Sequence, residues 1–187
     1  MNKAVFFDRD GTLIKDVPYL SNPELVQLES RVLPALRLLK DQGFKIIIVT
    51  NQSGIGRGLI SEEAYHDVHA RLIAILKERN LEVDDVFYCP YHSVHGKGDY
   101  KKESEDRKPS SGMLLKGIKR HSLSPEQCFM VGDKCSDVEA GQAASIKSIL
   151  VRTGDGVSSV SSLGSLSPDY IAEDVYDAVV NYILRVS

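Results

Sequence analysis

Residues 5–14 read VFFDRDGTLI, and this stretch decides the fold. The apolar residues 4–7 are typical of a buried strand, which ends at Asp8 in a polar, glycine-containing turn. Residues 44–49 and 127–131 are further apolar runs, and each is again followed by polar residues. Short apolar runs that alternate with helical patterns favour an α/β domain with a largely parallel sheet.

The rest of the chain continues this alternation. Residues 50–58, rich in glycine, are predicted to form a loop, and residues 154–168 a mobile surface loop. Ser136 and Glu139 have the spacing of a capping box and predict a helix start. No segment is long enough for a second domain, so we expect residues 1–187 to form one domain. The remaining predicted elements are strands at 83–88 and 148–151 and helices at 31–41, 61–80, 111–121 and 173–186.

Composition excludes several classes of protein. With 187 residues and 42% hydrophobic content, the chain is long enough for one full core. A formal net charge of −3 gives no reason to expect nucleic acid or a membrane surface as a partner. No apolar run is long enough to span a bilayer, and the amino terminus becomes charged too early for a signal peptide. The three cysteines do not have the spacing of a disulfide framework, so we expect a cytoplasmic protein. We also expect a monomer.

Polar residues follow four of the predicted strands. The carboxyl ends of parallel strands form the ligand crevice of an open α/β sheet, so these groups are expected to converge. Carboxylates suit Mg²⁺ better than zinc, while a hydroxyl, an amide and a lysine suit phosphoryl oxygens. The residues are Asp8 and Asp10, Thr50 and Asn51, Arg107 and Lys108, and Asp133.

This set of groups predicts phosphoryl transfer. An aspartate beside Mg²⁺ can attack phosphorus, and a carboxylate two residues along can protonate the leaving oxygen and later activate water. Each piece alone has a simpler interpretation: Asp-x-Asp-Gly is usually a turn, and an Arg-Lys pair is usually a surface feature. Their order along the chain, each after a strand, favours the functional interpretation.

The same stretches resemble a known family. VFFDRDGTLI, IIIVTNQSGIGRG, DRKP and VGDKCSD are similar to the four ordered motifs of the haloacid dehalogenase superfamily of phosphatases. More narrowly, the chain resembles the D-glycero-D-manno-heptose 1,7-bisphosphate 7-phosphatases over residues 4–154. The resemblance implies a Rossmann-like three-layer sandwich with a mostly parallel central sheet and no large cap domain. It also implies Mg²⁺-dependent hydrolysis of the 7-phosphate through an aspartyl phosphate, in nucleotide-activated heptose and lipopolysaccharide biosynthesis.

The resemblance further implies roles for individual residues. Asp8 is the expected nucleophile and Asp10 the general acid and base. Mg²⁺ is expected on the Asp8 carboxylate, the Asp10 backbone carbonyl and Asp133, supported from outside the ligand set by Asp137. Residues expected to hold the phosphoryl group are Thr50 and Lys108, and those expected to contact the substrate are Asp16, Tyr19, Asn51, Gln52, Ser53, Arg107 and Lys134.

Residues 88–109, YCPYHSVHGKGDYKKESEDRKP, depart from the family. Members that carry zinc resemble Cys-x-His, a spacer and then Cys-x-Cys before Arg-Lys-Pro, which supplies the four ligands of a structural site. Here Cys89 remains, while Tyr91, Ser104 and Asp106 stand at the other positions. We therefore expect no structural zinc. We also expect a more mobile loop than in zinc-bearing relatives, held by pairs between its lysines and carboxylates.

Two other functions stay open. Histidinol-phosphate phosphatases share the DRDGT motif, although residues 51–58 and 112–114 are closer to the heptose enzymes, and another small phosphosugar is a further alternative. A phospho-ligand binding module without activity would be expected to lack the nucleophile or the metal-binding aspartate. Asp8 and Asp133 are both present.

Purified protein is expected to contain no stoichiometric zinc, because Cys89 alone remains of the four ligand positions. Elemental analysis of dialysed protein should therefore give far less than one zinc per chain. One zinc per chain would contradict this prediction, and His92 and His95 would then be the first residues to replace by alanine.

Overall fold

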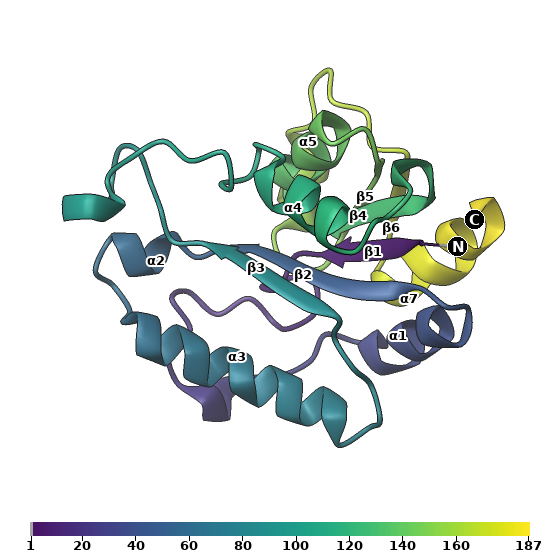
Figure 1. Cartoon of the computed structure of the whole chain (residues 1–187), viewed down its shortest axis with the longest axis horizontal. Coiled ribbons are helices and arrows are strands. Elements are labelled where there is room, and N and C mark those ends of the chain that lie inside the picture. The colour runs from purple at the N-terminus through teal and green to yellow at the C-terminus, as the bar shows by residue number, and fades with distance from the viewer. Residues whose placement is uncertain (1) are drawn as a thin grey trace.

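The computed structural model describes residues 2–187, which form one six-stranded sheet in which every pairing is parallel. The strand order is β3-β2-β1-β4-β5-β6, so the chain builds outward from β1 first in one direction and then in the other (Figure 1). This reversal places the carboxyl end of β1 at the switch point, where open α/β sheets bind ligands. The strands are β1 (Ala4–Phe7), β2 (Lys45–Asn51), β3 (Asp85–Cys89), β4 (Cys128–Gly132), β5 (Lys147–Val151) and β6 (Tyr170–Ala172).

Helices cover both faces of the sheet, which confirms the predicted α/β sandwich (Figure 1). One face carries α1 (Val32–Asp41), α3 (Glu62–Lys77) and the helical segment made of α7 (Val175–Asp177), η4 (Ala178–Ile183) and α8 (Leu184–Val186). The other face carries α4 (Gly112–Arg120) and α5 (Cys135–Ala143). Shorter elements are α2 (Ser53–Gly56), α6 (Gly156–Ser161), η1 (Pro23–Leu25), η2 (Gly98–Tyr100) and η3 (Pro125–Gln127).

The apolar run of β1 is buried on both faces. Val5 and Phe7 pack into the cluster beneath α1 and α3, while Ala4 and Phe6 pack into the cluster beneath α4 and α5. Successive side chains of a strand point to opposite faces, and all four are 0% exposed. This double burial explains why the strand has no polar residue before Asp8, at its carboxyl end.

Three local predictions are wrong. Residues 53–56 and 156–161, predicted as loop, form α2 and α6, because tertiary packing buries glycines that would disfavour an isolated helix. Helix α5 begins at Cys135, and Asp137 rather than Glu139 accepts a hydrogen bond from the backbone N–H of the residue before the helix, at 2.9 Å. The three-residue β6 was not predicted, since it is too short to give an apolar run.

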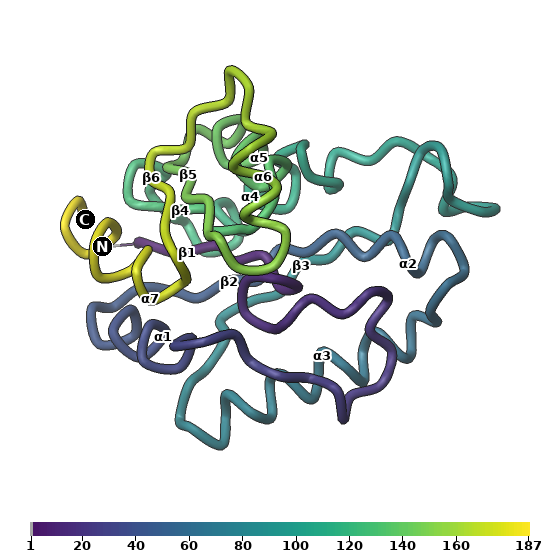
Figure 2. The backbone as a smooth tube through the Cα atoms, turned by 180° about the vertical axis from the view of Figure 1, so that it is seen from behind, coloured from purple at the N-terminus to yellow at the C-terminus, as the bar shows by residue number. Residues whose placement is uncertain are grey.

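Several long connections lie at the carboxyl edge of the sheet. The segment between β1 and α1 runs out past α2 and returns along α3, and residues 90–108 extend beyond the end of β3 (Figure 2). Helix α2 lies at the same edge (Figure 1). No helix among the described residues is both long and apolar enough to cross a membrane.

Gly117→Ala is expected to destabilise the protein by about 1–3 kcal/mol, the range for overpacking a core. A Cβ at this position of α4 would lie 2.6 Å from Cε1 of Phe6, although alanine normally favours a helix. Urea unfolding followed by circular dichroism measures the change. Lys119→Ala, an exposed change in the same helix, is the control. Equal stability of both variants would contradict the packing argument.

Candidate active site

Lys108 lies buried between two carboxylates. Its Nζ is 2.6 Å from Asp8 Oδ1 and 2.6 Å from Asp137 Oδ1, and it donates to the Val49 carbonyl at 2.8 Å. Burial disfavours the charged ammonium, but Asp137 and Asp8 outweigh burial and raise the pKa of Lys108. Lys108 is therefore a fixed cation that joins the ends of β1 and β2 to helix α5.

The residues after β2 position this lysine and its neighbours. Asn51 Nδ2 donates to the Lys108 carbonyl at 2.9 Å, and the Lys108 N–H donates to Asn51 Oδ1 at 3.1 Å. Gln52 Nε2 donates to Asp10 Oδ2 at 2.8 Å and to Thr50 Oγ1 at 2.9 Å. Both amides were predicted as substrate contacts. The structure shows that they align the side chains around them, while their contact with substrate stays a prediction.

Asp133 forms an acidic cluster with Asp8 and Asp137. Their carboxylate oxygens lie within 4.8 Å of one another, and Asp133 is fully buried. Asp133 Oδ2 accepts from the Asp155 N–H at 2.8 Å, while Oδ1 has no hydrogen-bond partner among the described residues. Burial and the charge of Asp8 raise the pKa of Asp133. Three carboxyl groups crowd around the single bonded Lys108, and an all-oxygen donor set of this kind fits Mg²⁺.

Two glycines let the backbone close over Asp133. Gly11 has φ of +85° and Gly154 φ of +53°, a region that side chains with a Cβ rarely adopt. A Cβ at either position would collide with Asp133 Oδ2 and would also crowd the backbone of the other glycine. Thr153 Oγ1 donates to the Gly11 carbonyl at 2.6 Å. The glycines therefore bring the β1 turn and the segment after β5 together around one carboxylate.

The Asp10 side chain points away from this cluster. Arg9 Nε donates to Asp10 Oδ2 at 3.1 Å and Nη2 donates to Oδ1 at 3.1 Å, so the two side chains form a two-pronged pair. The prediction from sequence missed Arg9. The available signal was a second charged residue immediately after Asp8 at the end of a fully apolar strand, where burial requires an ionic partner.

A cavity of about 420 Å³ opens beside Asp10 and carries both signs of charge. Lys134 Nζ lies 3.8 Å from Asp16 Oδ2 and 3.4 Å from Asp155 Oδ2. Burial alone would lower the pKa of Lys134, but the surrounding carboxylates raise it, so this side chain stays charged. The predicted substrate contacts among the lining residues are Asp16, Tyr19, Asn51, Gln52, Ser53 and Lys134.

Tyr19 meets a residue that the sequence did not single out. Arg57 Nη1 donates to Tyr19 Oη at 2.7 Å, and the guanidinium lies 5.4 Å from the ring centroid. This contact joins the segment after β1 to the turn after α2. Arg107, predicted to contact the substrate, does not line the cavity. It is half-buried instead and donates through Nη1 to the Tyr91 carbonyl at 3.2 Å.

The 89–108 loop is held by hydrogen bonds and ring contacts. Tyr91 and Tyr100 have ring centroids 6.0 Å apart, and Lys102 Nζ lies 4.1 Å from the centroid of the Tyr91 ring. The expected pairs of Lys101 and Lys102 with carboxylates are absent from the ion pairs of residues 2–187, because Lys102 faces a ring instead. Buried Cys89 has Ser104 beside its thiol.

Comparisons with known proteins identify the family. A family model described as "HAD-hyrolase-like" matches residues 106–178. The D-glycero-beta-D-manno-heptose-1,7-bisphosphate 7-phosphatase of Haemophilus influenzae is 43% identical over 178 residues, which cover 95% of each chain. The chain belongs to this phosphatase family. The D-glycero-D-manno-heptose-1,7-bisphosphate 7-phosphatase of Chlorobaculum tepidum is 37% identical over 97% of this chain and 94% of its own.

A solved structure supports the same assignment. The D,D-heptose 1.7-bisphosphate phosphatase of B. bronchiseptica, complexed with magnesium and phosphate, superposes with a TM-score of 0.86. It is 26% identical and the match covers 98% of this chain and 99% of that one. Membership in the heptose bisphosphate phosphatase family makes this chain a phosphoric monoester hydrolase of the haloacid dehalogenase type.

Asp133→Asn is expected to raise the melting temperature of metal-free protein. Because burial and Asp8 raise the pKa of Asp133 in the folded state, its ionisation costs stability as the pH rises above the ordinary aspartate pKa of 3.8. The gain should therefore be small at acidic pH and grow toward neutral pH. Thermal melts across this range measure it.

With Mg²⁺ added, wild type should become more stable than Asp133→Asn. Wild type should gain about 2.7 kcal/mol at a free Mg²⁺ concentration one hundred times its dissociation constant, and Asp133→Asn much less. A similar gain in both proteins would contradict the assignment of Asp133 as a cation ligand.

Proposed function

We propose that this chain hydrolyses the 7-phosphate of D-glycero-D-manno-heptose 1,7-bisphosphate with Mg²⁺ as cofactor. The observation that carries the proposal is the joined set of Asp8, Lys108 and Asp133 at the end of β1, with Asp10 on the side of the cavity. Nucleophile, charge-neutralising lysine, cation ligand and proton donor are the four functions that phosphate ester hydrolysis needs. The names of the relatives supply the sugar.

Asp8 is the nucleophile in this proposal. Its carboxylate attacks phosphorus, and the bond between phosphorus and the sugar oxygen breaks to leave an aspartyl phosphate. Lys108, fixed 2.6 Å from Asp8 Oδ1, offsets negative charge on the phosphoryl oxygens. Thr50, aligned by Gln52, offers its hydroxyl to the same group. Hydrogen bonds and ion pairs within the protein hold both side chains in place.

Asp10 moves the protons. It donates one to the leaving sugar oxygen, and its carboxylate then accepts one from the water that attacks the aspartyl phosphate. That second step releases inorganic phosphate and restores Asp8. Gln52 and Arg9 both hold the Asp10 carboxylate, so its two roles use one fixed orientation.

The cation would be held by Asp8, Asp133 and the Asp10 backbone carbonyl. Mg²⁺ at this position would neutralise the acidic cluster and polarise the phosphoryl group. Asp137 would act from outside the ligand set, because its oxygens already bind Lys108 and the Lys134 N–H.

The cavity suits a charged sugar more than an apolar ligand. Lys134 can bind an anionic group, while Asp16 and Asp155 can accept hydrogen bonds from hydroxyls. Tyr19, held by Arg57, offers a ring against which a sugar face can pack. We further propose a cytoplasmic, monomeric enzyme of activated-heptose synthesis.

Wild type is expected to show a higher kcat/KM for a heptose 1,7-bisphosphate than for histidinol phosphate, by about tenfold or more, which corresponds to 1.4 kcal/mol. Phosphate release is measured with the α and β anomers and with histidinol phosphate, each with and without Mg²⁺. A higher kcat/KM for histidinol phosphate would contradict the proposed substrate. Absence of Mg²⁺-stimulated hydrolysis of every ester would contradict the proposed chemistry.

Asp8→Asn should lower kcat by about 10³-fold or more, since removal of a nucleophile costs several orders of magnitude. Asp41→Asn, on an exposed position of α1, is the matched control and should leave kcat unchanged. Circular dichroism checks that both variants fold.

A further inference from the structure

Arg9 is a buried arginine that contacts a group of the proposed reaction. Its side chain is 1% exposed, whereas the side chain of Asp10 is 18% exposed. Nε and Nη2 each donate to a different Asp10 oxygen at 3.1 Å, which is the planar two-pronged geometry that only arginine can supply. Both residues line the cavity, where the more exposed Asp10 is held by the buried Arg9.

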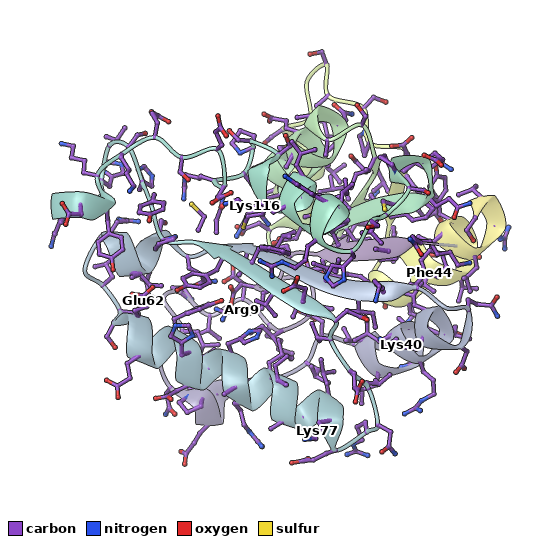
Figure 3. All side chains as sticks on the ribbon, viewed as in Figure 1. Arg9, Lys40, Phe44, Glu62, Lys77 and Lys116 are labelled. Carbon is purple, nitrogen blue, oxygen red and sulfur yellow. The ribbon has the colours of Figure 1, made fainter. Side chains whose placement is uncertain are left out.

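The side chains of Tyr65 and His69 beside Arg9 are uncharged, so its guanidinium pairs with Asp10. In Figure 3 Arg9 lies between the sheet and α3, and its guanidinium is 5.2 Å from the centroid of the Tyr65 ring. His69, on the same helix, is neutral at physiological pH, because burial and Arg9 lower the pKa of His69 to about 4. Among residues 2–187, the ion pair of Arg9 is with Asp10 alone.

A second contact fixes the remaining freedom of Asp10. Gln52 donates to Asp10 Oδ2 at 2.8 Å and is itself 7% exposed. The hydrogen bonds from Arg9 and Gln52 therefore fix the Asp10 side chain in one rotamer and its carboxyl group in one plane. A carboxyl group must be oriented to within a few tenths of an ångström for efficient proton transfer.

We propose that Arg9 is a positioning residue that orients the Asp10 carboxyl group for proton transfer to the leaving oxygen. This inference rests on the proposed function. In the first step Asp8 bonds to phosphorus, the bond from phosphorus to the alkoxide oxygen breaks, and that oxygen takes the proton of Asp10. A nitrophenolate leaves without needing a proton, so the same step on a nitrophenyl ester does not use Asp10.

The two classes of leaving group give a direct test. Arg9→Lys keeps the charge and the stem but lacks the second prong, and Arg9→Gln removes the charge. Both variants should lower kcat/KM for heptose 1,7-bisphosphate by about 10²-fold and for p-nitrophenyl phosphate by less than about threefold, since general acid catalysis contributes about 10²–10⁴-fold. Using kcat/KM confines the comparison to the step that forms the aspartyl phosphate.

Arg120 offers a matched control. Its Nη1 donates to both oxygens of Asp85 at 3.1 and 2.9 Å, and its guanidinium lies 4.8 Å from the centroid of the Phe87 ring, but its side chain is 61% exposed. Arg120→Lys and Arg120→Gln remove an equivalent pair away from the cavity. They should leave both values of kcat/KM unchanged.

Each outcome decides the question. Equal losses on the two esters, or no loss on either, would show that Arg9 is structural and overturn the proposal. Unfolding of both Arg9 variants, measured by circular dichroism and thermal melts, would do the same. If wild type hydrolyses neither ester with Mg²⁺, the proposed function itself fails, which is distinguishable because the defect then precedes any substitution.

Discussion

The ammonium of Lys108 between Asp8 and Asp137 is the interaction on which the rest of the site depends. A buried charge costs several kcal/mol unless it is paired, so the lysine and the two carboxylates are each stable only because the others are present. Asp8 follows β1, Asp137 belongs to α5, and the lysine also binds the carbonyl of Val49 in β2. One side chain thus connects three elements of the fold.

The sheet and the convergence of polar residues were predictable from the sequence, because both follow from the positions of apolar runs. A strand buried on both faces, such as β1, has no alternative to the centre of a parallel sheet. The orientation of individual side chains was not predictable. The pairing of Asp10 with Arg9 depends on Gln52 and on Tyr65 and His69 of α3, which lie more than forty positions away in the sequence. The short helices α2 and α6 also depend on packing, since their own glycines and serines do not favour a helix.

Hydrogen bonds connect the 89–108 loop to two neighbouring helices. The Lys97 N–H donates to the Gly56 carbonyl at 2.8 Å, and the hydroxyl of Tyr100 donates to Glu62 at 3.3 Å. These contacts connect the loop to α3 and to α2, whose Ser53 and Gly54 line the cavity. The same loop ends at Lys108, so the packing of its tyrosines and the placement of this buried lysine belong to one continuous segment.

The meeting of Gly11 and Gly154 over Asp133 limits how the sequence can vary. Most close contacts in a core tolerate compensation, because a larger side chain on one side can be matched by a smaller one on the other. Here both partners already have the smallest side chain, and both adopt positive φ. No change at one position can make room at the other. In a library randomised at both sites, selection for activity would therefore return only the Gly-Gly pair. The loops around the cavity are not subject to this restriction and can vary in sequence.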